Sequence, residues 1–186
     1  MNDQIQFAQA VIGLLEKAEI PYMFSGSMSS SFYGNYRTTN DIDIVIDPSR
    51  EQLLNFLTLL GNEYYYNKET AIQALSYRTM FNIVFMKTGC KADLMICKDR
   101  EYSKLEFSRR QTTTLRDTVV STVSPEDSIL SKLEWAKDSG SQKQLDDVRA
   151  MLKVQKNLLD YDYLNEWAQK LGVYKNLQTL MNENST

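Results

Sequence analysis

Two aspartates separated by one apolar residue, Asp41 and Asp43, are the residues of this sequence best suited to chemistry. The apolar, β-branched residues around them predict a strand over Ile42–Ile46 that the chain enters at the first aspartate. Side chains at i and i+2 of a strand point to one face, with α-carbons on the order of 7 Å apart. Two carboxylates held so close repel each other unless a cation lies between them. Oxygen-only ligands suit Mg²⁺ or Mn²⁺, so the pair predicts a divalent-metal site.

A third carboxylate, Asp93, lies in a later apolar segment. Phe81–Met86, a turn containing Gly89, and Lys91–Ile96 together predict a hairpin. Strand alternation places Lys91 on the same face as Asp93, whose sequence neighbours are apolar. Asp93 is therefore either a carboxylate held among buried residues or a solvent-facing aspartate on an edge strand.

The composition restricts the chemistry that the chain can perform. Its 186 residues include no histidine, which excludes histidine bases, Ser-His-Asp triads and histidine-containing zinc sites. Acid–base work must then come from carboxylates, lysine, tyrosine or water. The two cysteines, Cys90 and Cys97, flank one predicted strand, whose length keeps them too far apart for a disulfide. Their arrangement favours a reducing cytoplasm.

Charge and hydropathy narrow the range of partners. A net charge of −3 and a pI of about 5.1 disfavour a protein that tracks duplex DNA, but allow a small metal–nucleotide complex. The N-terminal segment lacks the basic region and long apolar run of a signal peptide. We expect no membrane partner, because no segment has the roughly 20 apolar residues that a membrane span needs.

The periodicity of the chain predicts an α+β, or mixed α/β, fold. A helix over 3–18 leads to an extended run at Tyr22–Ser25, a short helix over Ser29–Tyr33, and then the aspartate strand. Residues 98–117 are charged and turn-rich, and Val119–Val123 is a short strand. The rest is helical, beginning with Ser124 as N-cap and Pro125 at the first helical position. We expect an α/β core over 1–123 and a helical appendage packed on it over 124–186.

Two smaller features each allow two interpretations. Tyr64–Tyr66 is either a strand packed on the core or an aromatic surface for base stacking. Arg109 and Arg110 lie either on a solvated face or against a phosphate.

The segment from Phe24 to Asp47 resembles the nucleotidyltransferase superfamily related to DNA polymerase β. That pattern is a hydrophobic residue, a Gly-Gly or Gly-Ser pair, a spacer, and then Asp-hydrophobic-Asp-hydrophobic. Here it reads Gly26-Ser27 followed by Asp41-Ile42-Asp43-Ile44. Ser25 departs from the pattern by occupying the hydrophobic position, and the spacer is long. The resemblance implies a short mixed sheet backed by helices, with a helical appendage forming one wall of a cleft.

This resemblance also implies roles for particular residues. Asp41 and Asp43 bind Mg²⁺ or Mn²⁺, and Asp93 is the third catalytic carboxylate, able to act as a base. Gly26 and Ser27 begin a turn that lets backbone amides approach a triphosphate. The remaining nucleotide contacts come from Arg37, Thr38 and Lys132. Arg37 either binds a phosphate or forms an ion pair with Asp41 or Asp47, and these alternatives stay open.

Three further segments resemble an uncharacterised bacterial branch related to the AbiEii toxin components of abortive-infection systems. They are Tyr33–Asp43, Ser124–Trp135 and Gln144–Val148. Within the last, Asp147 matches a helical aspartate of that branch, whereas Gln144 departs from the acid that several members carry. The resemblance implies an antitoxin partner as one alternative.

Three hypotheses about function follow. The first is an enzyme that moves a nucleoside monophosphate from a nucleoside triphosphate (NTP) to a hydroxyl acceptor, which is a small molecule, a protein or an RNA. The second is a catalytically inactive nucleotide-sensing or partner-binding module with the same fold. The third is a structural domain, which the three aspartates argue against, since clustered acids destabilise a fold without a counter-charge.

Overall fold

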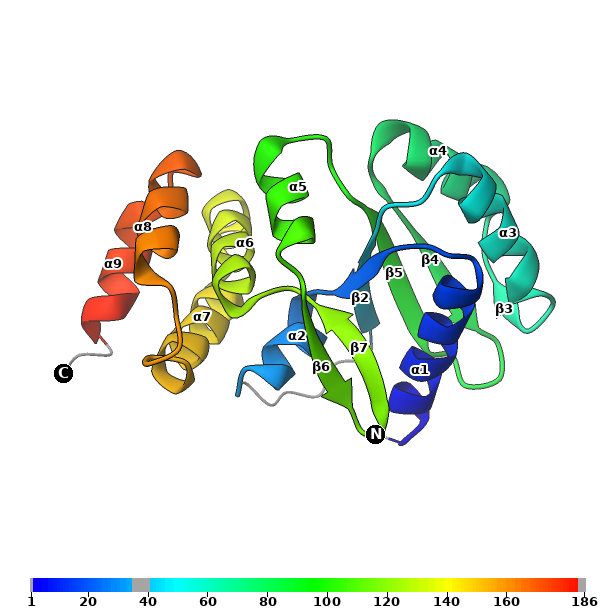
Figure 1. Ribbon diagram of the computed structural model, residues 1–186, viewed down its shortest axis with the longest axis horizontal. Helices are drawn as coiled ribbons and strands as arrows, with labels where there is room; N and C mark the ends of the chain where they lie inside the picture. Colours follow the sequence, from blue (N-terminus) through cyan, green and yellow to red (C-terminus); the bar gives the residue numbers. More distant parts are fainter. Residues whose placement is uncertain (1, 35–40, 184–186) are drawn as a thin grey trace. The chain divides into compact units, whose positions relative to one another are not determined.

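The computed structural model of this protein describes residues 2–34 and 41–183. In this part of the chain, seven strands form one mixed sheet in the order β3-β4-β5-β2-β1-β7-β6 (Figure 1). Parallel pairing joins β2 to β5 and β1 to β7, and the other neighbours are antiparallel. The strands are β1 (Tyr22–Phe24), β2 (Asp41–Ile46), β3 (Tyr64–Tyr65), β4 (Met80–Phe85), β5 (Lys91–Ile96), β6 (Gln111–Leu115) and β7 (Thr118–Thr122).

Helices alternate with these strands and then follow them. Their bounds are α1 (Asn2–Lys17), α2 (Gly26–Phe32), α3 (Arg50–Leu60), α4 (Lys68–Tyr77), α5 (Glu101–Ser108), α6 (Pro125–Ser139), α7 (Gln142–Val154), α8 (Tyr161–Lys170) and α9 (Tyr174–Glu183). The predicted mixed α/β fold class is confirmed. The described residues divide into two compact units, 2–28 with 41–123 and 29–34 with 124–183.

One face of the sheet in the first unit forms the apolar core. Ile42, Ile44 and Ile46 alternate along β2 and are completely buried. Ala92 and Leu94 of β5 lie beside them in register on the same face. Helices α1, α3 and α4 pack next to one another over this layer, and Figure 1 shows them gathered on one side of the sheet. The alternation expected from the sequence therefore separates an apolar face from the face that carries the aspartates.

The aspartate face is covered only in part. Helix α5 contributes Phe107 to a small apolar cluster. The other members of that cluster are Met23, Cys97 and Val123, with Val45 packed against it. Val45 lies two residues beyond Asp43 on the same strand face. The apolar cluster thus covers one end of β2 on this face, and the aspartates occupy the other end.

The second unit is helical and is organised around α6. Ser124 caps this helix by accepting a hydrogen bond from the backbone N–H of Asp127, with Pro125 at the first helical position, as predicted. Packing contacts join α6 to α7 and α8, and α9 to α7 and α8. Because α6 packs on two helices, both its apolar stripe and the adjacent face with Asp127 and Lys132 are buried.

Three elements differ from the expectation. Residues 98–117 were expected to be turn-rich, but they form α5 and the edge strand β6. Because β6 is mostly exposed, its Gln-Thr-Thr-Thr-Leu sequence shows no apolar alternation. Helix α2 begins at Gly26 rather than Ser29, and residues 29–34 group with the second unit. The predicted domain division at residues 123 and 124 therefore stays a prediction.

The two ambiguous surface features have structural partners. Tyr64 is buried and packs against Phe85, with ring centroids 5.2 Å apart, whereas Tyr65 is exposed. Tyr64 therefore belongs to the core. The guanidinium of Arg110 lies 4.7 Å from the centre of the Phe107 ring and donates to the Phe107 carbonyl oxygen. Its contact to phosphate stays a prediction.

Candidate functional site

The residues that the sequence singles out for metal binding come from two adjacent strands. Strand β2 presents Asp41 and Asp43 on the face opposite the buried isoleucines. Strand β5 runs parallel to it, with Asp93 in register with Asp43 and Lys91 in register with Asp41. Neighbouring strands lie about 4.8 Å apart, so the fold brings Asp93 beside the aspartate pair from far along the sequence.

Asp93 is not the solvent-facing edge residue that the sequence also allowed. Strand β5 lies inside the sheet, between β4 and β2. The Asp93 side chain is only 14% exposed, and its Oδ1 atom is buried without a hydrogen-bond partner in the described part of the chain. A buried carboxylate oxygen without a partner is costly, and such an atom calls for a cation or a donor that arrives with a ligand. That makes Asp93 Oδ1 the clearest sign of function in this cluster.

Lys91 supplies a counter-charge inside the cluster. Its Nζ atom lies 3.1 Å from Asp93 Oδ2 and 3.4 Å from Asp41 Oδ2, so one ammonium bridges the two strands. The hydrogen bond to Asp93 and the negative charges of Asp93 and Asp41 raise the pKa of Lys91 above its ordinary value. The sequence placed Lys91 on the Asp93 face, but did not identify it as a partner of Asp41. That contact depends on the parallel register of β2 and β5, which no local pattern encodes.

Gly26 brings a loop against the other side of the cluster. The backbone N–H of Ser25 donates to the Asp43 carbonyl oxygen over 2.9 Å, which fixes the end of β1 beside β2. Gly26 then adopts a φ of +59°, and a Cβ added there would lie 2.6 Å from Asp43 Cγ. A side chain at this position would therefore collide with the Asp43 carboxylate. Ser27 follows as the second residue of α2.

The other predicted nucleotide contacts are not brought to this cluster by any described interaction. Arg37 and Thr38 lie outside the described residues. Lys132, which the resemblance implied as a nucleotide contact, is buried in the second unit and binds Asp147, with 2.8 Å between Nζ and Oδ2. The same ammonium donates to Gln144 Oε1 over 3.2 Å. Lys132 therefore contacts two residues that the sequence marked in α7, and its contact with a triphosphate stays a prediction.

The ligand atoms of the aspartate cluster, all of them carboxylate oxygens, are of the kind that binds a hard divalent cation. All three predicted ligands are carboxylates, the buried Asp93 Oδ1 has no partner among the described residues, and Gly26 places no side chain of its own against Asp43. Across residues 2–34 and 41–183, however, no group of three or more Asp, Glu, Cys or His side chains is arranged to hold a metal ion. In this arrangement Lys91 binds two of the three carboxylates.

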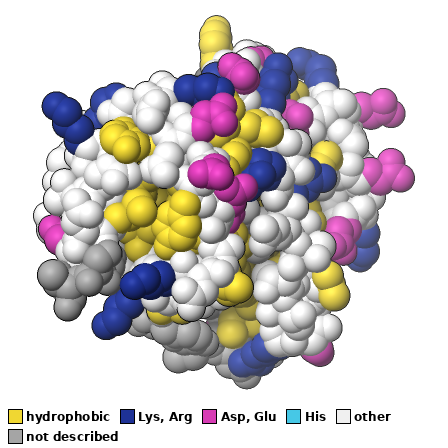
Figure 2. All heavy atoms as spheres, turned by 60° about the vertical axis from the view of Figure 1, so that its left-hand side comes forward, with side chains coloured by type: hydrophobic (Ala, Val, Ile, Leu, Met, Phe, Trp, Pro, Cys, Tyr) yellow, Lys and Arg dark blue, Asp and Glu magenta, His cyan; other side chains and the backbone are white. Residues whose placement is uncertain are grey.

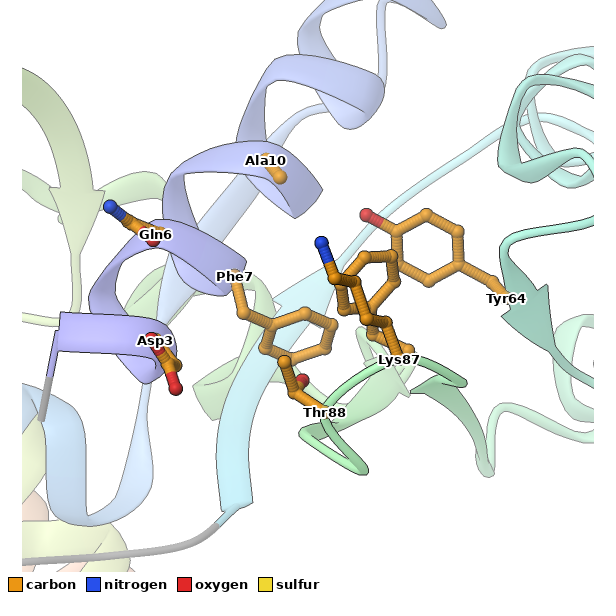
Figure 3. Close-up of a pocket in the computed structure, with 8 residues that line it drawn as sticks. Asp3, Gln6, Phe7, Ala10, Tyr64, Lys87 and Thr88 are labelled. Atoms are coloured by element: carbon orange, nitrogen blue, oxygen red, sulfur yellow. The ribbon is translucent and has the colours of Figure 1, made fainter.

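A separate cavity of about 420 Å³ lies in the first unit, on the other face of the sheet (Figure 3). The Phe7 ring of α1 stands 6.3 Å from the Tyr64 ring and 6.4 Å from the Phe85 ring, measured between centroids. Polar side chains from α1 and the β4–β5 turn surround these aromatic walls. The full lining is Asp3, Gln6, Phe7, Ala10, Tyr64, Phe85, Lys87 and Thr88. This cavity shares no residue with the aspartate cluster.

Replacing Gly26 with alanine tests the close approach to Asp43. We expect Gly26→Ala to lower the free energy of unfolding by about 2–4 kcal/mol, because positive φ and overcrowding act together. The matched control is Gly89→Ala, at a glycine of the same unit with a φ of +74° and open space around its α-carbon. It should lose about 1 kcal/mol, from backbone strain alone. Urea denaturation measures both, and equal losses would contradict the proposed contact.

Among the described residues, no helix is long and apolar enough to cross a membrane. No family model matches the sequence, and no curated protein resembles it closely enough to report. Solved structures do match. The solution structure of the antibiotic-resistance factor ANT(2'')-Ia is 13% identical, with a TM-score of 0.60 and 98% of each chain covered. The crystal structure of ANT(2'')-Ia in complex with adenylyl-2''-tobramycin is also 13% identical, with a TM-score of 0.59, covering 91% of this chain and 97% of that one.

An antigenic nucleotidyltransferase-like protein from Paracoccidioides brasiliensis is 16% identical, with a TM-score of 0.59. The match covers 97% of this chain and 93% of that one. At identities this low, the TM-scores of 0.59 and 0.60 show a shared fold and no more. The polypeptide described here has the fold of nucleotidyltransferases over nearly its whole length, as the resemblance in the aspartate segment implied.

Proposed function

We propose that this chain, which has a nucleotidyltransferase fold, is a metal-dependent nucleotidyltransferase that moves a nucleoside monophosphate from an NTP to a hydroxyl acceptor. The observation that carries the proposal is the buried, unpartnered Oδ1 of Asp93 beside Asp41 and Asp43 on two parallel strands. Within residues 2–34 and 41–183, no donor satisfies this oxygen, although Lys91 pairs with the other oxygen of the same carboxylate. Catalysis of this kind is mostly positioning and charge neutralisation.

The reaction forms one bond and breaks another. The acceptor oxygen bonds to the α-phosphorus, and the bond from that phosphorus to its bridging oxygen breaks, so pyrophosphate leaves with the electron pair. The hydroxyl proton passes to the carboxylate of Asp93, which acts as the base. A divalent cation held by Asp41, Asp43 and Asp93 would polarise the phosphate and stabilise the leaving group. Gly26 and Ser27 offer backbone amides near the triphosphate.

We also propose a class of acceptor for this reaction, which is a small molecule that carries a hydroxyl group. ANT(2'')-Ia, whose complex contains adenylyl-2''-tobramycin, matches this chain over nearly its whole length. That match supports a small hydroxyl-bearing acceptor. On the face shown in Figure 2, both acidic and basic side chains are present. The acidic pI of about 5.1 favours a small acceptor over a long nucleic acid. The toxin-like role with an antitoxin partner, and a cytoplasmic location, stay predictions from the sequence.

A second candidate function has one observation in its favour. Because the ammonium of Lys91 offsets part of the negative charge of Asp41 and Asp93, the cluster can exist without a metal. A catalytically inactive module that binds a nucleotide or a partner would keep such an arrangement. The two candidates differ in whether nucleotide binding needs a divalent cation.

Calorimetric titration of the four NTPs with and without Mg²⁺ separates these functions. We expect one or more NTPs to bind the wild-type protein only with Mg²⁺, and binding to be lost in Asp41→Asn/Asp43→Asn, because the carboxylates hold the cation. The matched control is Asp47→Asn, since Asp47 follows the same strand but pairs with Arg78 over 2.7 Å. It should bind like the wild type. Metal-independent binding would support the inactive module, and no binding would contradict the proposed enzyme.

A further inference from the structure

Lys91 is positioned where a cation shared by Asp41 and Asp93 would be. Its ammonium contacts one oxygen of each carboxylate, at 3.4 Å and 3.1 Å. The register of the sheet makes this arrangement specific, because Lys91 lies opposite Asp41 and two residues before Asp93 on the same face. Because β2 and β5 are neighbouring strands inside the sheet, Lys91 reaches both carboxylates without any movement of the backbone.

A lysine ammonium and a divalent cation cannot both use these oxygens. A magnesium ion requires carboxylate oxygens at about 2.1 Å, and a positive charge in contact with the same oxygens repels it. The Lys91 side chain is 32% exposed, so it can swing toward solvent without unfolding the strand. Asp93 Oδ1, which has no partner among the described residues, is a candidate metal ligand that Lys91 does not contact.

We propose that Lys91 is a resident counter-ion of the metal-free cluster, which leaves Asp41 and Asp93 when a divalent cation binds. This proposal rests on the proposed metal-dependent function and adds a positioning residue to it. In the absence of metal, Lys91 holds Asp41 and Asp93 together against their repulsion. Metal binding then has to overcome the ion pairs, so Lys91 weakens the affinity for the cation and frees its own ammonium for the incoming triphosphate.

The direction in which metal affinity changes when Lys91 is removed distinguishes this role from ordinary structural support. A lysine that only supports the fold would, when removed, loosen the cluster and weaken metal binding. A resident counter-ion would, when removed, strengthen it. A neighbouring charge shifts a binding equilibrium by at least about tenfold, and partial exposure of Lys91 places the effect at the lower end. We therefore expect Lys91→Met to bind Mn²⁺ about tenfold more tightly than the wild type.

The test uses the full chain and Mn²⁺ alone, without nucleotide. Free Mn²⁺ is quantified by electron paramagnetic resonance during titration, and thermal unfolding is followed with and without Mn²⁺. Lys91→Met should melt at a lower temperature without metal and show a larger stabilisation by Mn²⁺. Lys91→Arg keeps the charge and clamps a carboxylate with two donors, so its affinity should equal that of the wild type or fall below it.

Lys104→Met is the matched control, because Lys104 forms a comparable pair with Asp99 over 3.2 Å on the exposed surface. Its Mn²⁺ affinity should equal that of the wild type. Unchanged or weaker binding by Lys91→Met overturns the counter-ion role while leaving the proposed function intact, provided that the wild type binds Mn²⁺. Failure of the wild type to bind Mn²⁺ overturns both. If Lys91→Met does not fold, Lys91→Arg decides, since tighter binding than the wild type would contradict displacement.

Discussion

Asp93→Asn should reduce nucleotidyl transfer by about 10²–10³-fold while leaving the free energy of unfolding within about 1 kcal/mol of the wild type. The rate falls because the amide can neither accept the acceptor's proton nor neutralise a cation. Stability changes little because two effects oppose each other. The variant loses the ion pair with Lys91, but it also removes one negative charge from a crowded cluster.

The measurement is transfer of α-labelled NTP to acceptors in a cell extract, together with urea denaturation of each variant. Asp99→Asn is the control, because Asp99 pairs with Lys104 and Arg78 outside the cluster. It should transfer label at the wild-type rate. An Asp93→Asn protein that folds and transfers normally would remove Asp93 from the proposed mechanism. A loss of transfer that only tracks a loss of folded protein would do the same.

Lys132→Met should destabilise the second unit by about 3–5 kcal/mol, because it removes the ammonium that is paired with a buried carboxylate. The side chains of Lys132 and Asp147 are 7% and 6% exposed, so water cannot replace the lost partner. Lys132→Met/Asp147→Leu removes both charges and should recover most of the loss. Urea denaturation of the two variants measures the difference. Equal stability of single and double variants would show that the pair does not hold the helices.

The double variant also tests the other role predicted for Lys132. A folded Lys132→Met/Asp147→Leu protein with wild-type NTP affinity would exclude Lys132 as a triphosphate contact. A selective loss of affinity in that folded protein would support it. The exposed pair of Lys170 and Glu166 offers a control of the same chemistry, since its removal should change stability by no more than about 1 kcal/mol.

The sequence predicted the aspartate strands well because their evidence is local. Alternation in DIDIVI separates acids from isoleucines, and the structure keeps that separation residue by residue. The hairpin of β4 and β5 was likewise visible in its two apolar runs and their turn. The grouping of Asp93 with Asp43 was available only through the resemblance, because pairing of distant parallel strands leaves no local mark.

The missed features share one physical cause, which is dependence on partners distant in sequence. Helix α5 has a weak apolar pattern, although its Tyr102 and Phe107 are buried, and Phe107 packs with Met23, Cys97 and Val123. The burial of Lys132 against Asp147 depends on the packing of α6 on α7, which no local pattern of residues encodes. The ion pair between Lys91 and Asp41 could not be predicted, because it depends on which residue of β2 lies opposite Lys91 on β5.

Strand β2 pairs with β5 along its whole length, and with β1 over Ile44–Ile46, so the amides in the second half of the strand have neighbours along both edges. Exchange of those amides with deuterated solvent requires opening of the sheet itself, a rare event compared with fraying of the edge strands. The backbone of Ile44–Ile46, directly after the aspartates, is therefore expected to open slowly. Changes at the face that carries the aspartates should then come from side chains and from segments outside the sheet's interior.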